Sequence, residues 1–288
     1  MSMISFNVFR TLGLNGVTVL KPEQYLQHRQ ALQEARWVLF PEYWQVNALV
    51  FGLGCRIFPS LSSYLIGHDK VEMTRAFQMI APNNTPWTLI AANTDSEADR
   101  LWDTMLLPFV VKLPKAAMGE GVWLVNNRTD FERYRALTDI LYVQEYLPIV
   151  RDIRVVIVGG KMVTAYWRLQ ADQGFYNNVA RGGIVDHSPV PFQAVELALG
   201  VASTLGVDHA GFDVAMVGDH PYLLEFNRLF GNQGLPGGTA PLQEAMAEYL
   251  AESGLPGGAD HVDPDDPDQS GPNKPAREWS RSTENAIS

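Results

Sequence analysis

The sequence predicts a mixed α/β (α+β) protein, and two patterns of its apolar residues carry this prediction. Up to residue 139, short apolar runs alternate with longer helical stretches, as strands and helices alternate in an α/β protein. After that point, apolar runs paired across glycine-containing turns indicate antiparallel strands. Hydrophobic residues make up 46% of the 288 residues, which is enough to build a sizeable core.

Residues 1–68 are expected to form a small α/β lobe with an open sheet of three or four strands. Its candidate strands are Val17–Leu20, Trp37–Phe40 and Arg56–Phe58, with candidate helices between them. This length is short for a complete nucleotide-binding unit. We therefore expect a supporting lobe that does not fold alone.

Residues 69–139 are expected to form a second unit, with the order helix, strand, helix, strand, loop, strand, helix. Its clearest strands are Phe109–Leu113 and Gly121–Val125, joined by a glycine-bearing loop.

Residues 140–253 are expected to form a third unit, in which antiparallel strands dominate. It begins with the strand Leu141–Glu145, and a hairpin turning at Gly159-Gly160 joins Ile153–Val158 to Met162–Leu169. The remaining elements are a helix Phe192–Leu205, the paired strands Gly211–Val217 and Pro221–Asn227, and a helix Ala240–Ala251. Residues 254–288 are rich in proline and acidic residues, and we expect a disordered tail with little function.

Charge and composition exclude several classes of protein. With 22 basic and 32 acidic side chains, the formal net charge is −10, which argues against nucleic-acid or anionic-membrane binding but leaves a local basic cleft open. A single cysteine, Cys55, excludes a disulfide framework and a zinc-finger array. No apolar run is long enough to span a bilayer and no secretory signal is recognisable, so we expect a soluble, cytoplasmic protein.

Lys112 lies at the end of a buried strand, where an unpaired charge is costly. It requires an anion, and a polyphosphate or a structural carboxylate would serve. The loop that follows contains Gly119 and Gly121, whose backbone N–H groups could approach phosphate oxygens. It is not a Walker loop, and an ordinary hairpin loop is the alternative.

Polar groups also gather after two later strands. Glu145 and the backbone beyond it could face the edge of a purine, and Asp152 could accept hydrogen bonds from ribose hydroxyls. Arg168 and the amides and arginine of segment Tyr176–Gly183 could stabilise charge on a transferring phosphoryl group. Solvated charges at strand ends and on loops are the alternative in both cases.

The strongest pattern is Asp213, a turn, and the pair Glu225 and Asn227. Side chains two apart on a strand share a face, so Glu225 and Asn227 lie together, and Asp213 is within reach on the partner strand. Two carboxylates and an amide oxygen suit one or two magnesium ions that also hold phosphates, not zinc. The alternative is a pair of strand-edge acids beside a solvated asparagine.

No pattern supports covalent catalysis. The six histidines show no paired spacing, a Gly-x-Ser-x-Gly elbow is absent, and Cys55 has no neighbouring histidine. The tryptophans, including Trp37, Trp44, Trp87 and Trp123, are interpreted as core residues.

In their order along the chain, these patterns together resemble the ATP-grasp superfamily, and above all its RimK-type, alpha-L-glutamate ligase-like carboxylate–amine ligases. The resemblance covers residues 67–235. The string Asp152-Ile153-Arg154-Val155-Val156-Ile157-Val158-Gly159-Gly160-Lys161 is similar to that group's hairpin, and Asn178-Val179-Ala180-Arg181-Gly182-Gly183 to its next signature. The resemblance implies an ATP-grasp fold, with the nucleotide held between two α+β subdomains after a short N-terminal lobe.

The resemblance also implies roles for individual residues. The implied phosphate contacts are Lys70, Lys112, Gly119, Gly121, Asn177 and Asn178. The implied adenosine contacts are Glu145 with the main chain of Tyr146 and Leu147 for adenine, and Asp152 for ribose. Asp213, Glu225 and Asn227 would hold one or two Mg²⁺ ions, for which Mn²⁺ could substitute. Arg168 and Lys112 would be catalytic, with Arg168 supporting the acylphosphate and tetrahedral intermediates.

The implied activity is ATP-dependent formation of an amide or peptide bond. A carboxylate attacks the γ-phosphate to give an acylphosphate and ADP, and an amine then displaces phosphate. Glutamate or another amino acid would be added to a peptide, protein or small-molecule acceptor. The oligomeric state stays open, and a non-catalytic ATP-binding sensor and an ATP-grasp phosphotransferase are the alternatives. Arg228-Leu229-Phe230-Gly231 stands where the group usually has Pro-Gly, which predicts a bulky ring near the acceptor site.

Overall fold

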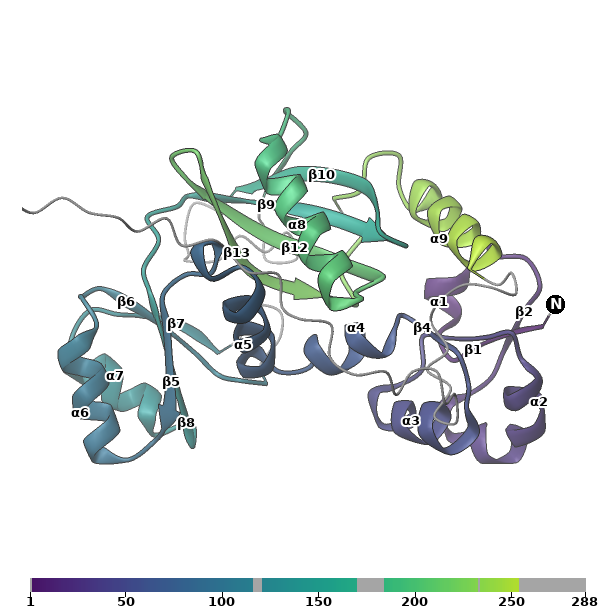
Figure 1. The fold of residues 1–288 in the computed structure, drawn as a ribbon, viewed down its shortest axis with the longest axis horizontal. Coiled ribbons are helices and arrows are strands. Elements are labelled where there is room, and N and C mark those ends of the chain that lie inside the picture. Colours follow the sequence, from purple (N-terminus) through teal and green to yellow (C-terminus); the bar gives the residue numbers. More distant parts are fainter. Residues whose placement is uncertain (1, 116–120, 170–183, 233, 254–288) are drawn as a thin grey trace, which may run out of the picture.

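The structure, a computed structural model, describes residues 2–115, 121–169, 184–232 and 234–253. It contains three sheets arranged in a row, with helices packed against them (Figure 1). We call the units around these sheets the N-terminal lobe, the small lobe and the central lobe, and the central lobe lies between the other two. The predicted mixed α/β class is confirmed.

The N-terminal lobe is an open parallel sheet in the order β2-β1-β3-β4. Its strands are β1 (Met3–Ser5), β2 (Val17–Val19), β3 (Trp37–Leu39) and β4 (Ile57–Phe58), and its helices are α1 (Val8–Thr11), α2 (Arg29–Glu34), α3 (Tyr43–Asn47) and α4 (Leu61–Ile66). The predicted open sheet is therefore present. The sequence analysis missed β1, because three residues are too few to show a strand period.

The small lobe is an antiparallel sheet in the order β5-β8-β6-β7. Its strands are β5 (Thr88–Ala92), β6 (Phe109–Lys112), β7 (Val122–Val125) and β8 (Ile140–Glu145), and its helices are α6 (Asp95–Thr104) and α7 (Arg128–Arg135). The boundary predicted at residue 140 falls just before β8. In the structure β8 joins this sheet, because Leu141 and Val143 pack into the core beneath α6 and α7.

The central lobe is an antiparallel sheet in the order β11-β10-β9-β12-β13. Its strands are β9 (Arg151–Val158), β10 (Lys161–Leu169), β11 (Ile184–Asp186), β12 (His209–Val217) and β13 (His220–Asn227). The predicted hairpin between β9 and β10 is confirmed. Gly159 and Gly160 have φ values of 57° and 75°, the left-handed pair that a tight two-residue hairpin turn requires.

Helices cover both faces of the central sheet (Figure 1). Helices α5 (Lys70–Ile80) and α8 (Phe192–Leu205) share a core with one face. Helix α9 (Ala240–Glu252) and the N-terminal lobe share a core with the other face. Helix α5 thus packs on the central lobe, although it precedes the small lobe in the chain.

The interpretation of the tryptophans as core residues was right for Trp37, which is 2% exposed, and wrong for the other three. Trp44 (57% exposed), Trp87 (46%) and Trp123 (37%) lie on a short helix, before a strand and on the open face of β7. These short elements leave too little apolar surface to cover a large ring.

Several predicted features lie outside the described residues: Gly119, Asn177, Asn178 and the tail 254–288. Within the described ranges, no helix combines the length and the apolar character needed to cross a membrane.

Candidate active site

A network of four buried charges lies on the central sheet, on strands β9, β10 and β12. Arg168 donates from Nε and Nη2 to the two carboxylate oxygens of Asp152, at 2.7 Å each, and its Nη2 also lies 2.9 Å from Oδ2 of Asp213. Arg154 Nε lies 2.6 Å from the other Asp213 oxygen. The sheet register sets these pairs, since Arg168 lies opposite Asp152 and Asp213 lies opposite Arg154. The network fixes the Arg168 guanidinium in one orientation.

The electrostatics of this network keep Arg168 charged. Burial alone would lower the pKa of Arg168, but the Asp213 and Asp152 carboxylates more than offset this and raise it. Burial raises the pKa of Asp213, and the Arg154 and Arg168 guanidiniums act against this rise. Two arginines and two aspartates balance in charge, as a buried cluster requires.

Glu225 and Asn227 lie beside this network on β13. Glu225 is the cross-strand neighbour of Asp213, and Asn227 is the neighbour of Gly211. Asn227 Nδ2 donates to Glu225 Oε1 at 3.1 Å, so the two side chains share one face of the sheet. Both residues are half-buried.

Lys112 ends β6 and is 8% exposed, with Nζ 5.6 Å from the centre of the Tyr142 ring. Among the described residues, no carboxylate oxygen lies within 4.0 Å of this ammonium. Burial lowers the pKa of Lys112, and the more distant Glu225 and Asp213 carboxylates oppose the shift. A structural carboxylate was the alternative partner predicted for Lys112, and none is found among the described residues.

Lys70 begins α5, and its N–H donates to the carbonyl oxygen of Pro114 at 3.0 Å, next to the glycine loop. Burial would raise the pKa of Glu225, but the charges of Lys70 and Lys112 lower it. Positive charge from the start of α5 and from the small lobe thus faces an acidic edge of the central lobe. This junction is the arrangement expected around a bound polyphosphate and its metal.

The start of the segment after β8 is bonded to the residue before β5. Glu145 Oε1 accepts from the backbone N–H of Trp87 at 2.7 Å, while Tyr146 is 37% exposed and Leu147 is half-buried. The contact between Trp87 and Glu145 was not predicted from the sequence. The position of Trp87 just before β5, which pairs with β8, was the available signal.

Two of the predicted contact residues already have partners within the protein. Both oxygens of Asp152 accept from Arg168, and Asp152 is 4% exposed, so a ribose contact requires the carboxylate to be shared. Gly121 has φ 72°, and its carbonyl oxygen accepts from the N–H of Leu113 at 2.7 Å. The carbonyl of Gly121 thus closes the base of the hairpin that carries the glycine loop.

The metal ligands predicted from the sequence fit a hard divalent cation in their chemistry. In the part of the chain that the structure describes, no group of three or more His, Cys, Asp and Glu side chains forms a closed metal site. The set of Asp213, Glu225 and Asn227 contains two carboxylates and one amide oxygen. A carboxylate has about four lone-pair positions, so Asp213 can bind a metal while it keeps its arginine partners. Such a set suits Mg²⁺ together with phosphate oxygens.

Comparison with known proteins adds to this geometry. The RimK-like ATP-grasp domain matches residues 69–240. A probable alpha-L-glutamate ligase of Enterobacter sp. (strain 638) is 31% identical over 217 residues, which cover 70% of this chain and 72% of that protein. A ribosomal protein bS6–L-glutamate ligase of Salmonella paratyphi B is 31% identical over 194 residues, 62% of this chain and 64% of that protein.

Among solved structures, D-alanine–D-alanine ligase from Bacillus anthracis complexed with ATP is similar with a TM-score of 0.63 and 16% identity. The similarity covers 88% of this chain and 98% of that chain. At this identity it shows the fold, and the predicted ATP-grasp architecture is confirmed.

Proposed function

Because this chain belongs to the RimK-like ATP-grasp family, we propose that it is an ATP- and Mg²⁺-dependent ligase that joins a carboxylate to an amine through an acylphosphate. The observation that carries the proposal is Lys112, a buried ammonium with no carboxylate within 4.0 Å among the described residues. A buried charge of this kind requires an anion, and the polyphosphate of ATP supplies one. Glu225 and Asn227 across the junction supply oxygen ligands for the accompanying metal.

In the first step, a carboxylate oxygen of the substrate forms a bond to the γ-phosphorus, and the bond from that phosphorus to the ADP oxygen breaks. Lys112 and Lys70 neutralise the phosphate charge, and Asp213, Glu225 and Asn227 would hold the magnesium that screens it. Arg168, oriented by Asp152, stabilises the charge on the acylphosphate. We keep the predicted nucleotide contacts of Glu145, Tyr146, Leu147, Asp152, Gly119, Gly121, Asn177 and Asn178 as part of the proposal.

In the second step, the amine nitrogen bonds to the acyl carbon while the bond from that carbon to the phosphate oxygen breaks. Phosphate leaves with the electron pair and takes up the proton that the amine releases. No covalent enzyme intermediate is needed, and the side chains act by positioning and by charge stabilisation. The relatives' names support an amino acid, glutamate in their case, as one substrate and a peptide or protein as the other.

The proposal is tested by incubating the full chain with ATP, magnesium and pools of amino acids, with and without peptide acceptors. We expect ADP and phosphate release that depends on one pool, with a new product whose mass equals that of two substrates less one water. Lys112→Met, which removes the charge and keeps most of the length of the side chain, should lose this activity. ADP release with a phosphorylated product and no amide would overturn the ligase in favour of a phosphotransferase. ATP binding without turnover in every pool would favour a sensor.

A further inference from the structure

Arg154 and Gly211 lie beside the proposed metal ligands, on the same face of the central sheet. Arg154 of β9 and Glu225 of β13 are both cross-strand neighbours of Asp213. Gly211 lies two residues before Asp213 on β12, opposite Asn227. Directly opposed residues of antiparallel strands have their side chains on one face, and so do residues two apart on one strand. Arg154 and Gly211 therefore share the face that carries the metal ligands.

Arg154 holds the carboxylate of Asp213 through two nitrogen atoms. Nη2 donates to Oδ2 at 3.3 Å, and Nε lies 2.6 Å from Oδ1. Arg154 is 7% exposed and Asp213 is 5% exposed, so water competes little for this pair. Arg168 contacts the same carboxylate at Oδ2, with Nη2 2.9 Å away. Because Arg154 approaches Oδ1 most closely, it helps to set the rotation of the carboxylate about its Cβ–Cγ bond.

Arg154 reaches this carboxylate across Gly211, at a place where a side chain does not fit. A Cβ atom added to Gly211 would lie 2.6 Å from Arg154 Nη1 and 2.8 Å from Arg154 Cδ. It would also lie 3.2 Å from the Cβ of Phe230. Phe230 does not give way easily, because it is 2% exposed and stacks on His209 with ring centres 5.0 Å apart. An added methyl group must therefore displace Arg154.

A displaced Arg154 cannot keep its contacts with Asp213. The close approach at Cδ is decisive, because this atom lies in the middle of the side chain and cannot move without the guanidinium. A movement of the guanidinium tip alone would relieve the contact at Nη1 and leave the contact at Cδ. The missing side chain of Gly211 thus decides whether Arg154 can hold Asp213.

We propose that Arg154 is a positioning residue for the metal, which holds the Asp213 carboxylate in its binding orientation, and that Gly211 makes room for it. The inference rests on the proposed function in one respect, since Asp213 belongs to the metal ligands of that proposal. A carboxylate that is already held in place loses less conformational freedom when it binds a cation, so the cation binds more tightly. This advantage is lost when Arg154 is removed or displaced.

Binding of Mn²⁺ in the presence of ADP tests the proposal without turnover. The full chain is added to a fixed mixture of Mn²⁺ and ADP, and free Mn²⁺ is measured by electron paramagnetic resonance. We expect Arg154→Ala and Gly211→Ala each to weaken Mn²⁺ binding by roughly tenfold. Arg154→Lys keeps the charge without the planar fork and should weaken it less. Unchanged or tighter Mn²⁺ binding in a folded Arg154→Ala or Gly211→Ala variant would overturn the proposal.

Gly200→Ala is the matched control. Gly200 is an exposed residue of α8, where an added Cβ meets no described atom of another part of the chain within 4 Å. This variant should bind Mn²⁺ within about twofold of the wild type. Thermal denaturation establishes that each variant is folded. If Arg154→Ala does not fold, because Asp213 loses a buried partner, Arg154→Lys and Gly211→Ala still test the proposal.

A double variant shows whether Gly211 acts through Arg154. Arg154→Ala removes both atoms that an added methyl group would approach most closely. In that background, Gly211→Ala should weaken Mn²⁺ binding by less than about a further twofold, because the arginine is no longer there to be displaced. Two effects that multiply to roughly a hundredfold would overturn the role assigned to Gly211.

The dependence of turnover on magnesium separates this inference from the proposed function. If the chain is a ligase, Gly211→Ala should raise the KM for Mg²⁺ roughly tenfold, while kcat at saturating Mg²⁺ changes by less than about threefold. A lower kcat with an unchanged KM for Mg²⁺ would overturn the inference and leave the ligase standing. If Mn²⁺ binding depends on Arg154 and Gly211 but no amide forms with any substrate pool, the inference stands and the ligase fails.

Discussion

The central lobe meets its two neighbours in different ways. Its junction with the N-terminal lobe is an apolar core that includes Trp37, Leu39, Phe58, Val156, Tyr166, Met246 and Leu250. Among the residues that the structure describes, the core of the small lobe consists of the lobe's own side chains. This lobe meets α5 of the central lobe through hydrogen bonds, such as the 2.7 Å bond between the hydroxyls of Thr74 and Tyr142.

This difference assigns a separate task to each junction. Apolar packing does not tolerate displacement, so it fixes the N-terminal lobe relative to the central sheet. A polar junction with little shared core can open and close at low cost, as a nucleotide that enters between two lobes requires. We therefore expect changes at the polar junction to affect turnover, and changes at the apolar junction to affect stability.

The largest effect is expected for Glu225→Ala, at the polar junction. The change removes a proposed metal ligand that is close to the charges of Lys70 and Lys112 and lies outside the hydrophobic cores, so turnover should fall by at least about a thousandfold. The thermal midpoint should change by less than about 2 °C. ADP release and calorimetry check the two parts. Glu97→Ala, at an exposed helical pair, is the control, and wild-type turnover in Glu225→Ala would remove Glu225 from the metal set.

A matched pair of leucines compares the two cores directly. Leu39 in β3 and Leu141 in β8 are both 0% exposed. Changing either one to alanine should lower the free energy of unfolding by about 2–5 kcal/mol. Leu39→Ala should lower the midpoint temperature of the main unfolding transition, because the core that contains Leu39 joins two lobes. Leu141→Ala should instead give an earlier, separate transition of the small lobe, detected by hydrogen exchange of residues 88–145. One common transition in both variants would contradict the separation of the cores.

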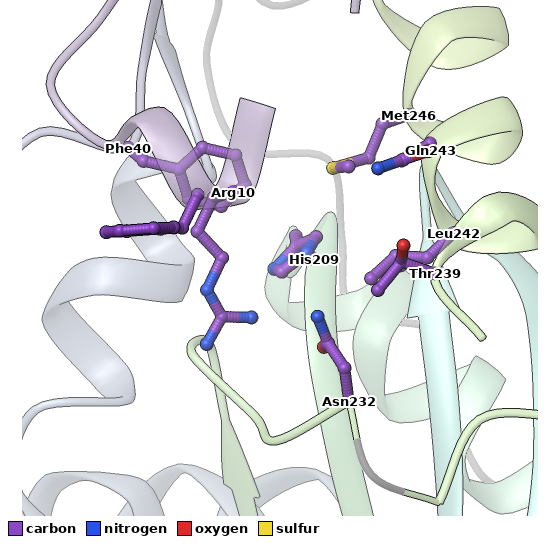
Figure 2. Close-up of a pocket in the computed structure, with 9 residues that line it drawn as sticks. Arg10, Phe40, His209, Asn232, Thr239, Leu242, Gln243 and Met246 are labelled. Carbon is purple, nitrogen blue, oxygen red and sulfur yellow. The ribbon is translucent and has the colours of Figure 1, made fainter. Parts of the chain in front are cut away.

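The sequence could predict what depends on local spacing. Glu225 and Asn227 are two apart, and the turn at Gly159-Gly160 is signalled by its own residues, so these features needed no tertiary information. The Arg154–Asp213 pair joins residues 59 positions apart through the register of β9 and β12, which no local pattern encodes. A small pocket lined by α1, β12 and the segment after β13 brings Arg10, His209 and Asn232 together from three parts of the chain (Figure 2), and none of them belongs to a motif.

Asp208 offers a test of the apolar junction by pH. Its Oδ1 accepts from the Ser60 N–H at 2.7 Å, which links α4 to the central lobe, and burial raises its pKa to about 6 from 3.8. Between these values the unfolded chain has lost a proton that the folded chain keeps, so this group lowers stability as pH rises. The total loss is about 3 kcal/mol, complete above pH 6.

Asp208→Asn removes this dependence and keeps an oxygen that can accept from Ser60. The stability of the variant relative to wild type should therefore rise by up to about 3 kcal/mol between pH 4 and pH 7, measured by urea unfolding. His209, whose pKa is lowered to about 3, favours the folded state as pH rises, but it is present in both proteins and cancels. A difference that stays constant with pH would show that Asp208 is ionised throughout.

The smallest effect is expected at the hydrogen bond between Thr74 and Tyr142. Thr74→Val removes one hydroxyl, and the Tyr142 oxygen still accepts from Gln144 Nε2 at 3.3 Å. The free energy of unfolding, measured with urea, should therefore fall by about 1 kcal/mol. Thr104→Val is the control, because among the described residues its hydroxyl bonds to the carbonyl oxygen of Arg100 in its own helix and to no other group. If the junction is a hinge, Thr74→Val should also increase hydrogen exchange in β5 and β8 and leave the Leu39 core unchanged. A loss above about 3 kcal/mol would mean that this contact holds the lobes as firmly as a buried leucine does, and the contrast between the two junctions would then fail.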